Sequence, residues 1–152
     1  MTNPSSWDIV LDLLQAQPLG VLGTSREGHA YTSLVAFVAS TDARSLYFAT
    51  TRATRKYHNL TADERVALLI DNRSNRTQDF YGAAAVSAYG RALEVDATAH
   101  AELQALYLAR HPQLKSFVSA PSTALFRITV DNYQLVVRFQ HVTEFRMTEC
   151  TT

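Results

Sequence analysis

The sequence has one cysteine, five glycines, four prolines and no net charge. Cys150 stands two residues from the C-terminus, so no internal disulfide forms, and we expect a reducing, cytoplasmic location. The fourteen basic and fourteen acidic side chains balance, whereas general binding to nucleic acid or to a membrane surface needs a basic excess. We therefore expect neither nucleic acid nor a membrane as a partner.

Long apolar runs are also missing. No segment approaches the roughly 20 residues of a membrane-spanning helix, and the polar N-terminus lacks the order of a signal peptide. The histidines show no metal-ligand spacing, so no metal site is expected, and spacing alone identifies no catalytic triad or carboxylate pair. The sequence consists of 47% apolar and 18% charged residues. This composition predicts a single globular domain over residues 1–152.

Two longer helices are predicted from caps and apolar periodicity. The first begins at Ser5, which fits a capping box with Asp8, and ends at the following proline. The second is capped by Asp96 or Thr98 and ends before Pro112. A third, shorter helix with basic residues follows residue 54.

Alternating apolar residues predict six or seven antiparallel strands. Gly28 supplies a positive φ for a tight turn between the first two, and Gly90 is a candidate bulge. Asp131 and Asn132 form either a tight turn or a bulge, and the pattern leaves both open. The expected strands are residues 19–25, 29–40, 45–50, 66–70, 83–95 and the stretches on either side of 131–132. Closure removes exposed edges, so we expect a mainly β fold, a β-barrel with flanking helices.

The most informative segment runs from Thr50 to Leu60, because it places basic side chains where a strand passes into a helix. Thr54 is the predicted N-cap. A helix start has unpaired N–H groups and the positive end of the helix dipole, and both favour a phosphate or a carboxylate. The hydroxyls of Thr50 and Thr54 and the cations of Arg55 and Lys56 complete such a site. The segment therefore predicts a phosphate-binding corner, with a solvated basic helix face as the alternative.

This corner resembles the core of the pyridoxamine 5′-phosphate oxidase-like flavoproteins, which are FMN-binding split barrels. The resemblance is carried by residues 49–60 after a strand and by the strand 65–70 that follows. Residues 32–37 are similar to the strand on which that family lays its flavin, and residues 85–92 and 125–139 follow in the family's order. The resemblance covers roughly residues 19–139 and implies a split β-barrel that binds FMN.

The resemblance also assigns residues to the cofactor. The implied ligands of the FMN phosphate are Thr50, Thr54, Arg55 and Lys56. The residues implied beside the isoalloxazine ring are Ser33, Leu34, Val35 and Ala49. In such proteins two subunits pair through their barrels and share two flavins, so a homodimer with flavin at the interface is implied, acting on a small-molecule substrate.

The chain departs from the family's full oxidases at three places. It has no Arg or Lys between residues 33 and 40, where those enzymes carry further phosphate ligands. An alanine near Ala85 replaces a glutamine that they direct to the neighbouring flavin, and their C-terminal Arg/His substrate motif is absent. The resemblance thus favours a small oxidoreductase of another substrate over oxidation of pyridoxamine phosphate. It names no side chain as acid, base or nucleophile.

Three alternatives stay open at this point. A haem-handling split barrel has a similar Ser-Leu-Val strand, and a histidine such as His141 would then ligate the iron. A deazaflavin has a phosphate that suits the same cationic corner. A non-catalytic flavin-binding protein needs no redox turnover.

Overall fold

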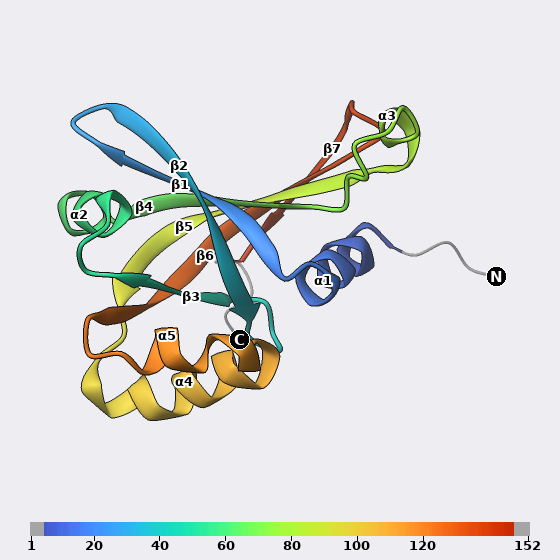
Figure 1. Cartoon of the computed structure of the whole chain (residues 1–152). Helices are drawn as coiled ribbons and strands as arrows, with labels where there is room; N and C mark the ends of the chain where they lie inside the picture. The colour runs from blue at the N-terminus through green and yellow to red at the C-terminus, as the bar shows by residue number, and fades with distance from the viewer. Residues whose placement is uncertain (1–4, 148–152) are drawn as a thin grey trace.

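The computed structural model describes residues 5–147, so Cys150 lies outside the described residues. Its seven strands form one antiparallel sheet in the order β3-β2-β1-β4-β5-β6-β7 (Figure 1). An additional pairing of β3 with β6 closes the first six into a barrel, which confirms the predicted mainly β fold. The strands are β1 (Leu19–Arg26), β2 (His29–Ala39), β3 (Ser45–Thr51), β4 (Arg65–Asp71), β5 (Ala84–Glu94), β6 (Thr123–Val137) and β7 (His141–Arg146).

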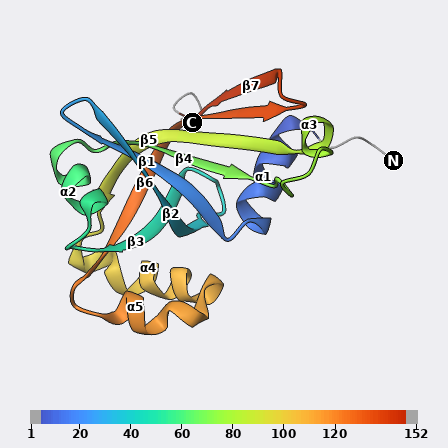
Figure 2. The same ribbon diagram turned by 45° about the horizontal axis from the view of Figure 1, so that its top comes forward.

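Helices lie at several places around the barrel. Figures 1 and 2 show α4 and α5 together along β3, and α3 at the other end of the sheet beside β7. The helices are α1 (Ser6–Ala16), α2 (Arg55–Ala62), α3 (Asp79–Gly82), α4 (Ala97–Arg110), the 3₁₀ turn η1 (Pro112–Leu114) and α5 (Lys115–Ser119). None of the helices within residues 5–147 is long and apolar enough to cross a membrane.

Side-chain caps begin the two longer helices where the sequence predicts them. At the start of α1, Asp8 N–H donates to Ser5 Oγ, and Ser5 N–H donates to the Asp8 carboxylate, both at 3.2 Å. At the start of α4, Asp96 accepts from Ala99 N–H at 3.1 Å, so Asp96 and not Thr98 is the N-cap. Each cap satisfies N–H groups that have no partner within the helix.

Two glycines permit the strand geometry. Gly28 has a φ of 80° in the turn between β1 and β2, a conformation that residues with a Cβ rarely adopt. At Gly90 a Cβ would collide with the carbonyl oxygen of Thr129, so β5 and β6 approach too closely there for any other residue. The turn at Gly28 agrees with the sequence prediction, and the register of β5 against β6 shifts between Tyr89 and Gly90, where the sequence predicts a bulge.

The pairing of β5 with β6 decides the question at residues 131–132. Tyr89 pairs with Asn132, while the next residue, Gly90, pairs with Val130, so Asp131 is the extra residue of a bulge. β6 therefore runs unbroken from Thr123 to Val137.

Two apolar clusters stabilise the barrel. One fills its interior and includes Phe37 and Tyr133, both fully buried. The other lies between β3 and the α4–α5 region and includes Tyr47, Leu103 and Tyr107. This second cluster fixes α4 and α5 against the two strands that carry the predicted ring-binding residues.

Candidate functional site

A pocket of about 280 Å³ lies where β2 and β3 meet the start of α2 and the α4–α5 region. Its lining residues are Leu34, Val35, Ala36, Ala49, Thr50, Thr51, Thr54, Lys56, Tyr107, Leu114 and Phe117. Six of the eight residues that the sequence predicts for a cofactor are therefore brought together here: Leu34, Val35, Ala49, Thr50, Thr54 and Lys56. Their assignment to a cofactor remains a prediction.

Two threonine hydroxyls tie the end of β3 to the start of α2. The Oγ1 atoms of Thr50 and Thr54 lie 2.8 Å apart, and Thr50 is buried. Thr54 is the N-cap, as predicted, and its hydroxyl accepts from Tyr57 N–H at 3.3 Å and donates to the Thr51 carbonyl at 3.0 Å. The hydroxyl pair thus fixes the orientation of the first turn of α2, and with it the direction of the free N–H groups of that turn.

Lys56 is the cation of this pocket. Burial lowers the pKa of its ammonium group from the ordinary value of 10.5. Within residues 5–147 its side chain makes no ion pair and no hydrogen bond. The first N–H groups of α2 likewise have no acceptor within the helix. An unpaired, partly desolvated cation beside a helix start fits an anionic group.

Arg55 and Ser33 do not line this pocket. The guanidinium carbon of Arg55 lies 5.3 Å from the centroid of the Tyr31 ring, at a separate pocket of about 270 Å³. Consecutive helical side chains point about 100° apart, so Arg55 and Lys56 diverge. The Ser33 hydroxyl oxygen is buried and has no hydrogen-bond partner within the described residues. Both residues remain predicted ligands that the structure places apart from the other six.

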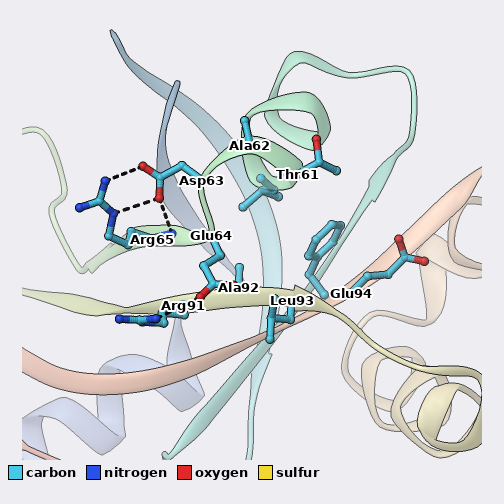
Figure 3. A pocket seen from close by; sticks show the side chains of 11 residues that line it. Thr61, Ala62, Asp63, Glu64, Arg65, Arg91, Ala92, Leu93 and Glu94 are labelled. Atoms are coloured by element: carbon cyan, nitrogen blue, oxygen red, sulfur yellow. Dashed lines mark hydrogen bonds and ion pairs between the residues drawn. The ribbon is translucent and has the colours of Figure 1, made fainter. Parts of the chain in front are cut away.

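A larger pocket, of about 630 Å³, lies between the end of α2 and the strands β4 and β5 (Figure 3). Its charged side chains pair with one another or with a neighbour. The ion pairs are Arg65–Asp63 at 2.8 Å, Arg91–Glu64 at 3.1 Å and Arg52–Glu94 at 2.6 Å. Because these charges already neutralise each other, we place the candidate site at the smaller pocket with the unpaired lysine.

The sequence prediction missed the wall that α4, η1 and α5 contribute. Tyr107 donates its hydroxyl to the Ala36 carbonyl at 3.2 Å, and burial raises the pKa of Tyr107 to about 12. Tyr107 is therefore a neutral, fixed wall of the pocket, together with Leu114 and Phe117. The one sequence signal for these residues is the apolar periodicity of the helix.

Metal-binding groups are absent from the part of the chain that the structure describes. Residues 5–147 contain no group of three or more His, Cys, Asp or Glu side chains able to hold a metal ion. His141 is exposed at the start of β7 and does not line the candidate pocket. His111 is buried, and its Nε2 lies 2.7 Å from the Phe37 carbonyl oxygen.

A closed six-stranded barrel with a cationic strand-to-helix corner on its outer side defines a split-barrel protein. The sequence model described as Pyridoxamine 5′-phosphate oxidase matches residues 7–137. The chain therefore belongs to the pyridoxamine 5′-phosphate oxidase family. No curated protein gives a significant sequence match.

Solved structures share this fold at low sequence identity. A heme binding protein from Mycobacterium smegmatis has a TM-score of 0.83 at 17% identity, over 96% of this chain and 60% of that one. A FAD-binding protein from Mesorhizobium loti has a TM-score of 0.68 at 17% identity, over 87% of this chain and 92% of that one. General Stress Protein 26 from Bacillus anthracis has a TM-score of 0.68 at 21% identity, over 92% of this chain and 97% of that one. At these identities the likeness shows the fold alone.

Proposed function

We propose that the chain binds FMN in the pocket between β2, β3 and the α4–α5 region. The observation that carries the proposal is the make-up of this pocket. Leu34 and Ala49 supply apolar walls, and Lys56 supplies an unpaired cation at a helix start. An apolar slot with a phosphate-binding corner is the chemistry that a flavin nucleotide requires.

Each group has a proposed role. The Lys56 ammonium, the N–H groups at the start of α2 and the hydroxyls of Thr50 and Thr54 hold the phosphate. Leu34, Val35 and Ala49 line the same pocket and would hold the ring. Arg55 and Ser33 are proposed ligands through the family resemblance alone.

A bound flavin supplies electron or hydride transfer, and the protein supplies position and electrostatics. Backbone N–H groups along residues 33–35 would hydrogen-bond a bound flavin ring and would favour negative charge on it. The apolar walls exclude water from it. We propose a small oxidoreductase in the cytoplasm, acting on a small-molecule substrate other than pyridoxamine phosphate.

A second copy of the chain completes the proposed site. The pocket of about 280 Å³ lies just below the range of about 300–1,000 Å³ typical of small-molecule sites, and Leu34 at its edge is 63% exposed. A homodimer that covers Leu34 would enclose a flavin at the interface. Sedimentation velocity, with and without FMN, measures whether the chain pairs.

Titration of FMN into the apoprotein, followed by quenching of flavin fluorescence, tests the proposed cofactor. Lys56→Met is expected to weaken FMN binding by at least about tenfold, because it removes a charge-assisted contact. Lys115→Met is the matched control, since Lys115 is exposed and does not line the pocket. Equal FMN affinity in the Lys56→Met variant and the wild type would contradict the proposed phosphate site.

Haem is the second candidate, because the fold is shared with a heme binding protein from Mycobacterium smegmatis. His141, exposed at the start of β7, is the proposed iron ligand in that case. The visible spectrum of the purified protein separates the two, since a flavin gives two broad bands and haem a single intense Soret band. Mass analysis of the released cofactor distinguishes FMN from a deazaflavin. Turnover with NADH or NADPH excludes a non-catalytic role.

A further inference from the structure

Glu94, at the end of β5, contacts residues on both sides of the N-cap of α2. Its carboxylate accepts a hydrogen bond from Arg52 Nη2 at 2.6 Å. The Tyr57 hydroxyl donates to the other carboxylate oxygen at 3.5 Å. Arg52 lies in the turn before the N-cap Thr54, and Tyr57 lies in the first turn of the helix. One acidic side chain therefore contacts both the turn and the helix that form the proposed phosphate-binding corner.

The bond between Glu94 and Arg52 joins this corner to the sheet. Glu94 pairs with Phe126 on β6, and Phe126 pairs on its other side with Phe48 of β3. Arg52 directly follows β3, and its backbone N–H donates to the Ser122 carbonyl oxygen at 2.9 Å. β5 is itself paired with β4 and with β6. A side chain on a paired strand is held more precisely than one on a loop, so Glu94 is a firm anchor for the turn.

The ring of Tyr57 supplies a second contact. It meets the Phe126 ring edge-on, with centroids 5.9 Å apart and an interplanar angle of 74°. The guanidinium carbon of Arg52 lies 5.9 Å from the centroid of the Tyr57 ring. Arg52 thus has a carboxylate and a ring as partners, which together restrict its position. An ion pair as exposed as this one adds little to stability, so its effect is mainly on geometry.

The turn that is held in this way presents the groups proposed to bind phosphate. Tyr57 N–H donates to the Thr54 hydroxyl, and His58 N–H donates to the Thr54 carbonyl oxygen, both at 3.3 Å. The N–H groups of Arg55 and Lys56 come before these and have no acceptor within the helix. A rotation of this turn would redirect these N–H groups and the Lys56 ammonium group together.

We propose that Glu94 is a positioning residue of the phosphate-binding corner. It holds Arg52 and Tyr57 against the sheet, so that the first N–H groups of α2 and the Lys56 ammonium group point to one place. Glu94 itself does not contact the phosphate. This role rests on the proposed binding of FMN in the adjacent pocket.

Titration of the apoprotein with FMN and with riboflavin, which lacks the phosphate, tests this role. The ratio of the riboflavin Kd to the FMN Kd measures what the phosphate contributes. Glu94→Gln is expected to lower this ratio by at least about fivefold and to change the riboflavin Kd by less than about twofold. Tighter FMN binding in Glu94→Gln would overturn the role, because the carboxylate would then only screen the positive charge of the corner.

A double-mutant cycle tests whether Glu94 acts through Arg52. Arg52→Gln should lower the ratio as much as Glu94→Gln does, and the double variant should lower it no further, because both single changes remove the same bond. Additive losses would contradict this. Amide exchange of the apoprotein reports on the corner without any cofactor and should become faster in the first turn of α2 in both single variants. Unchanged exchange there would rule out a positioning role.

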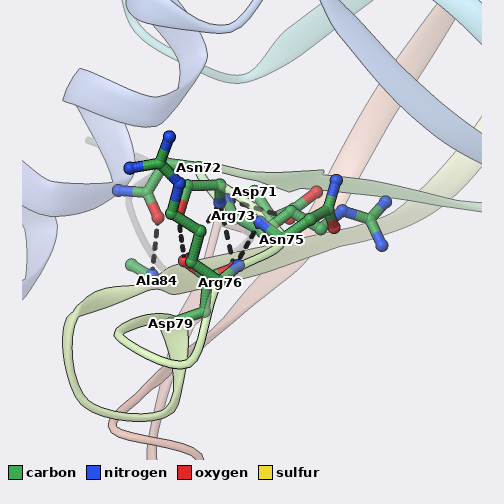
Figure 4. A network of polar contacts seen from close by, with 8 residues as sticks. Asp71, Asn72, Arg73, Asn75, Arg76, Asp79 and Ala84 are labelled. Carbon is green, nitrogen blue, oxygen red and sulfur yellow. Dashed lines mark hydrogen bonds and ion pairs between the residues drawn. The ribbon is translucent and has the colours of Figure 1, made fainter.

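Two control variants separate position from charge and from stability. Glu64→Gln breaks an ion pair with Arg91, and the Glu64 side chain is 39% exposed, like that of Glu94. Asp79→Asn disturbs a carboxylate that accepts the backbone N–H groups of residues 74, 75 and 76 (Figure 4), beside α3 at the opposite end of the sheet from α2 (Figure 1). Asp79→Asn should lower the melting temperature, and both variants should keep the wild-type ratio. An equal fall of the ratio in Glu64→Gln and Glu94→Gln would mean that charge alone matters.

The phosphate site and the role of Glu94 fail in different ways. Equal affinity of the wild type for FMN and riboflavin would contradict the phosphate site itself. A wild-type preference for FMN that Glu94→Gln keeps in full would leave the phosphate site in place and overturn the role of Glu94 alone.

Discussion

Arg110 contacts Phe37 through both the backbone and the ring. Its Nη1 donates to the Phe37 carbonyl oxygen at 3.2 Å, and its guanidinium carbon lies 4.9 Å from the centroid of the Phe37 ring. Its Nη2 donates to the carbonyl oxygens of Gln15 at 3.0 Å and Gln17 at 2.6 Å. One side chain at the end of α4 thus joins this helix to β2 and to the C-terminal end of α1.

Arg110→Met is expected to lower the free energy of unfolding by about 2 kcal/mol, because it removes charge-assisted bonds to three carbonyl groups. Urea unfolding at neutral pH measures the change. Arg26→Met is the control, since Arg26 is exposed at the end of β1 and a surface change of this kind shifts stability little. Equal losses in the two variants would contradict the role given to Arg110.

Lys56 is expected to destabilise the apoprotein while serving the cofactor. Burial lowers the pKa of Lys56 in the folded chain below its value of 10.5 in the unfolded chain. At a pH between these two pKa values, the unfolded chain binds more protons than the folded chain does. Stability of the wild-type apoprotein should therefore rise with pH from the folded-state pKa of Lys56 towards 10.5. Lys56→Met should raise the melting temperature of the apoprotein at neutral pH and remove this rise.

Thermal melts between neutral pH and pH 10.5 measure both effects. Lys115→Met is the control and should keep the rise with pH. A lower melting temperature for the Lys56→Met apoprotein would mean that Lys56 stabilises the fold, and that its positive charge is already compensated.

Local signals predicted the parts of the fold whose physical cause is local. The capping box of Ser5 and Asp8 and the turn at Gly28 depend on neighbours a few residues away, so the sequence shows them directly. The local sequence at Asp131 is compatible with a turn. Asp131 lies in a bulge because Gly90 on the partner strand approaches β6 closely there. Strand β7 is defined by its pairing with the end of the long strand β6, and no local sequence pattern predicts this pairing.

The candidate site was predicted only in part, for the same reason. The corner formed by Thr50, Thr54 and Lys56 is a local strand-to-helix motif, and the order of the family's segments supplied the strand at Leu34. The wall at Tyr107 comes from a helix far along the chain, whose apolar face resembles that of any packed helix. The direction of Arg55 follows from helix geometry and the nearby Tyr31 ring, which a list of basic residues does not reveal.

Thr54→Ala is expected to lower the free energy of unfolding by about 1 kcal/mol, because it removes the N-cap of α2. Thr54→Ser keeps a hydroxyl that accepts from Tyr57 N–H and should stay close to the wild type. Chemical denaturation compares the two variants, and amide exchange should become faster in the first turn of α2 in the alanine variant alone. Equal stability of the two variants would show that the hydroxyl does not cap the helix.

Gly90→Ala is expected to lower the free energy of unfolding by about 2 kcal/mol or more, because the added methyl group meets backbone atoms that cannot move independently. A Cβ at this position collides with the Thr129 carbonyl oxygen and lies 3.1 Å from the Val130 Cα atom, so β5 must shift away from β6. The bulge at the same place ties these atoms to the register of both strands. Urea unfolding, with amide exchange along β5 and β6, measures the effect.

Gly23→Ala in β1 is the matched control. There the nearest atoms to an added Cβ are the Ala67 carbonyl oxygen at 3.6 Å and the Ala67 Cβ at 3.9 Å, which is ordinary contact. The alanine also restricts the unfolded chain, so stability should stay the same or rise by a few tenths of a kcal/mol. If both glycine variants unfold at the same urea concentration, the close approach of β5 and β6 is not what requires glycine at residue 90.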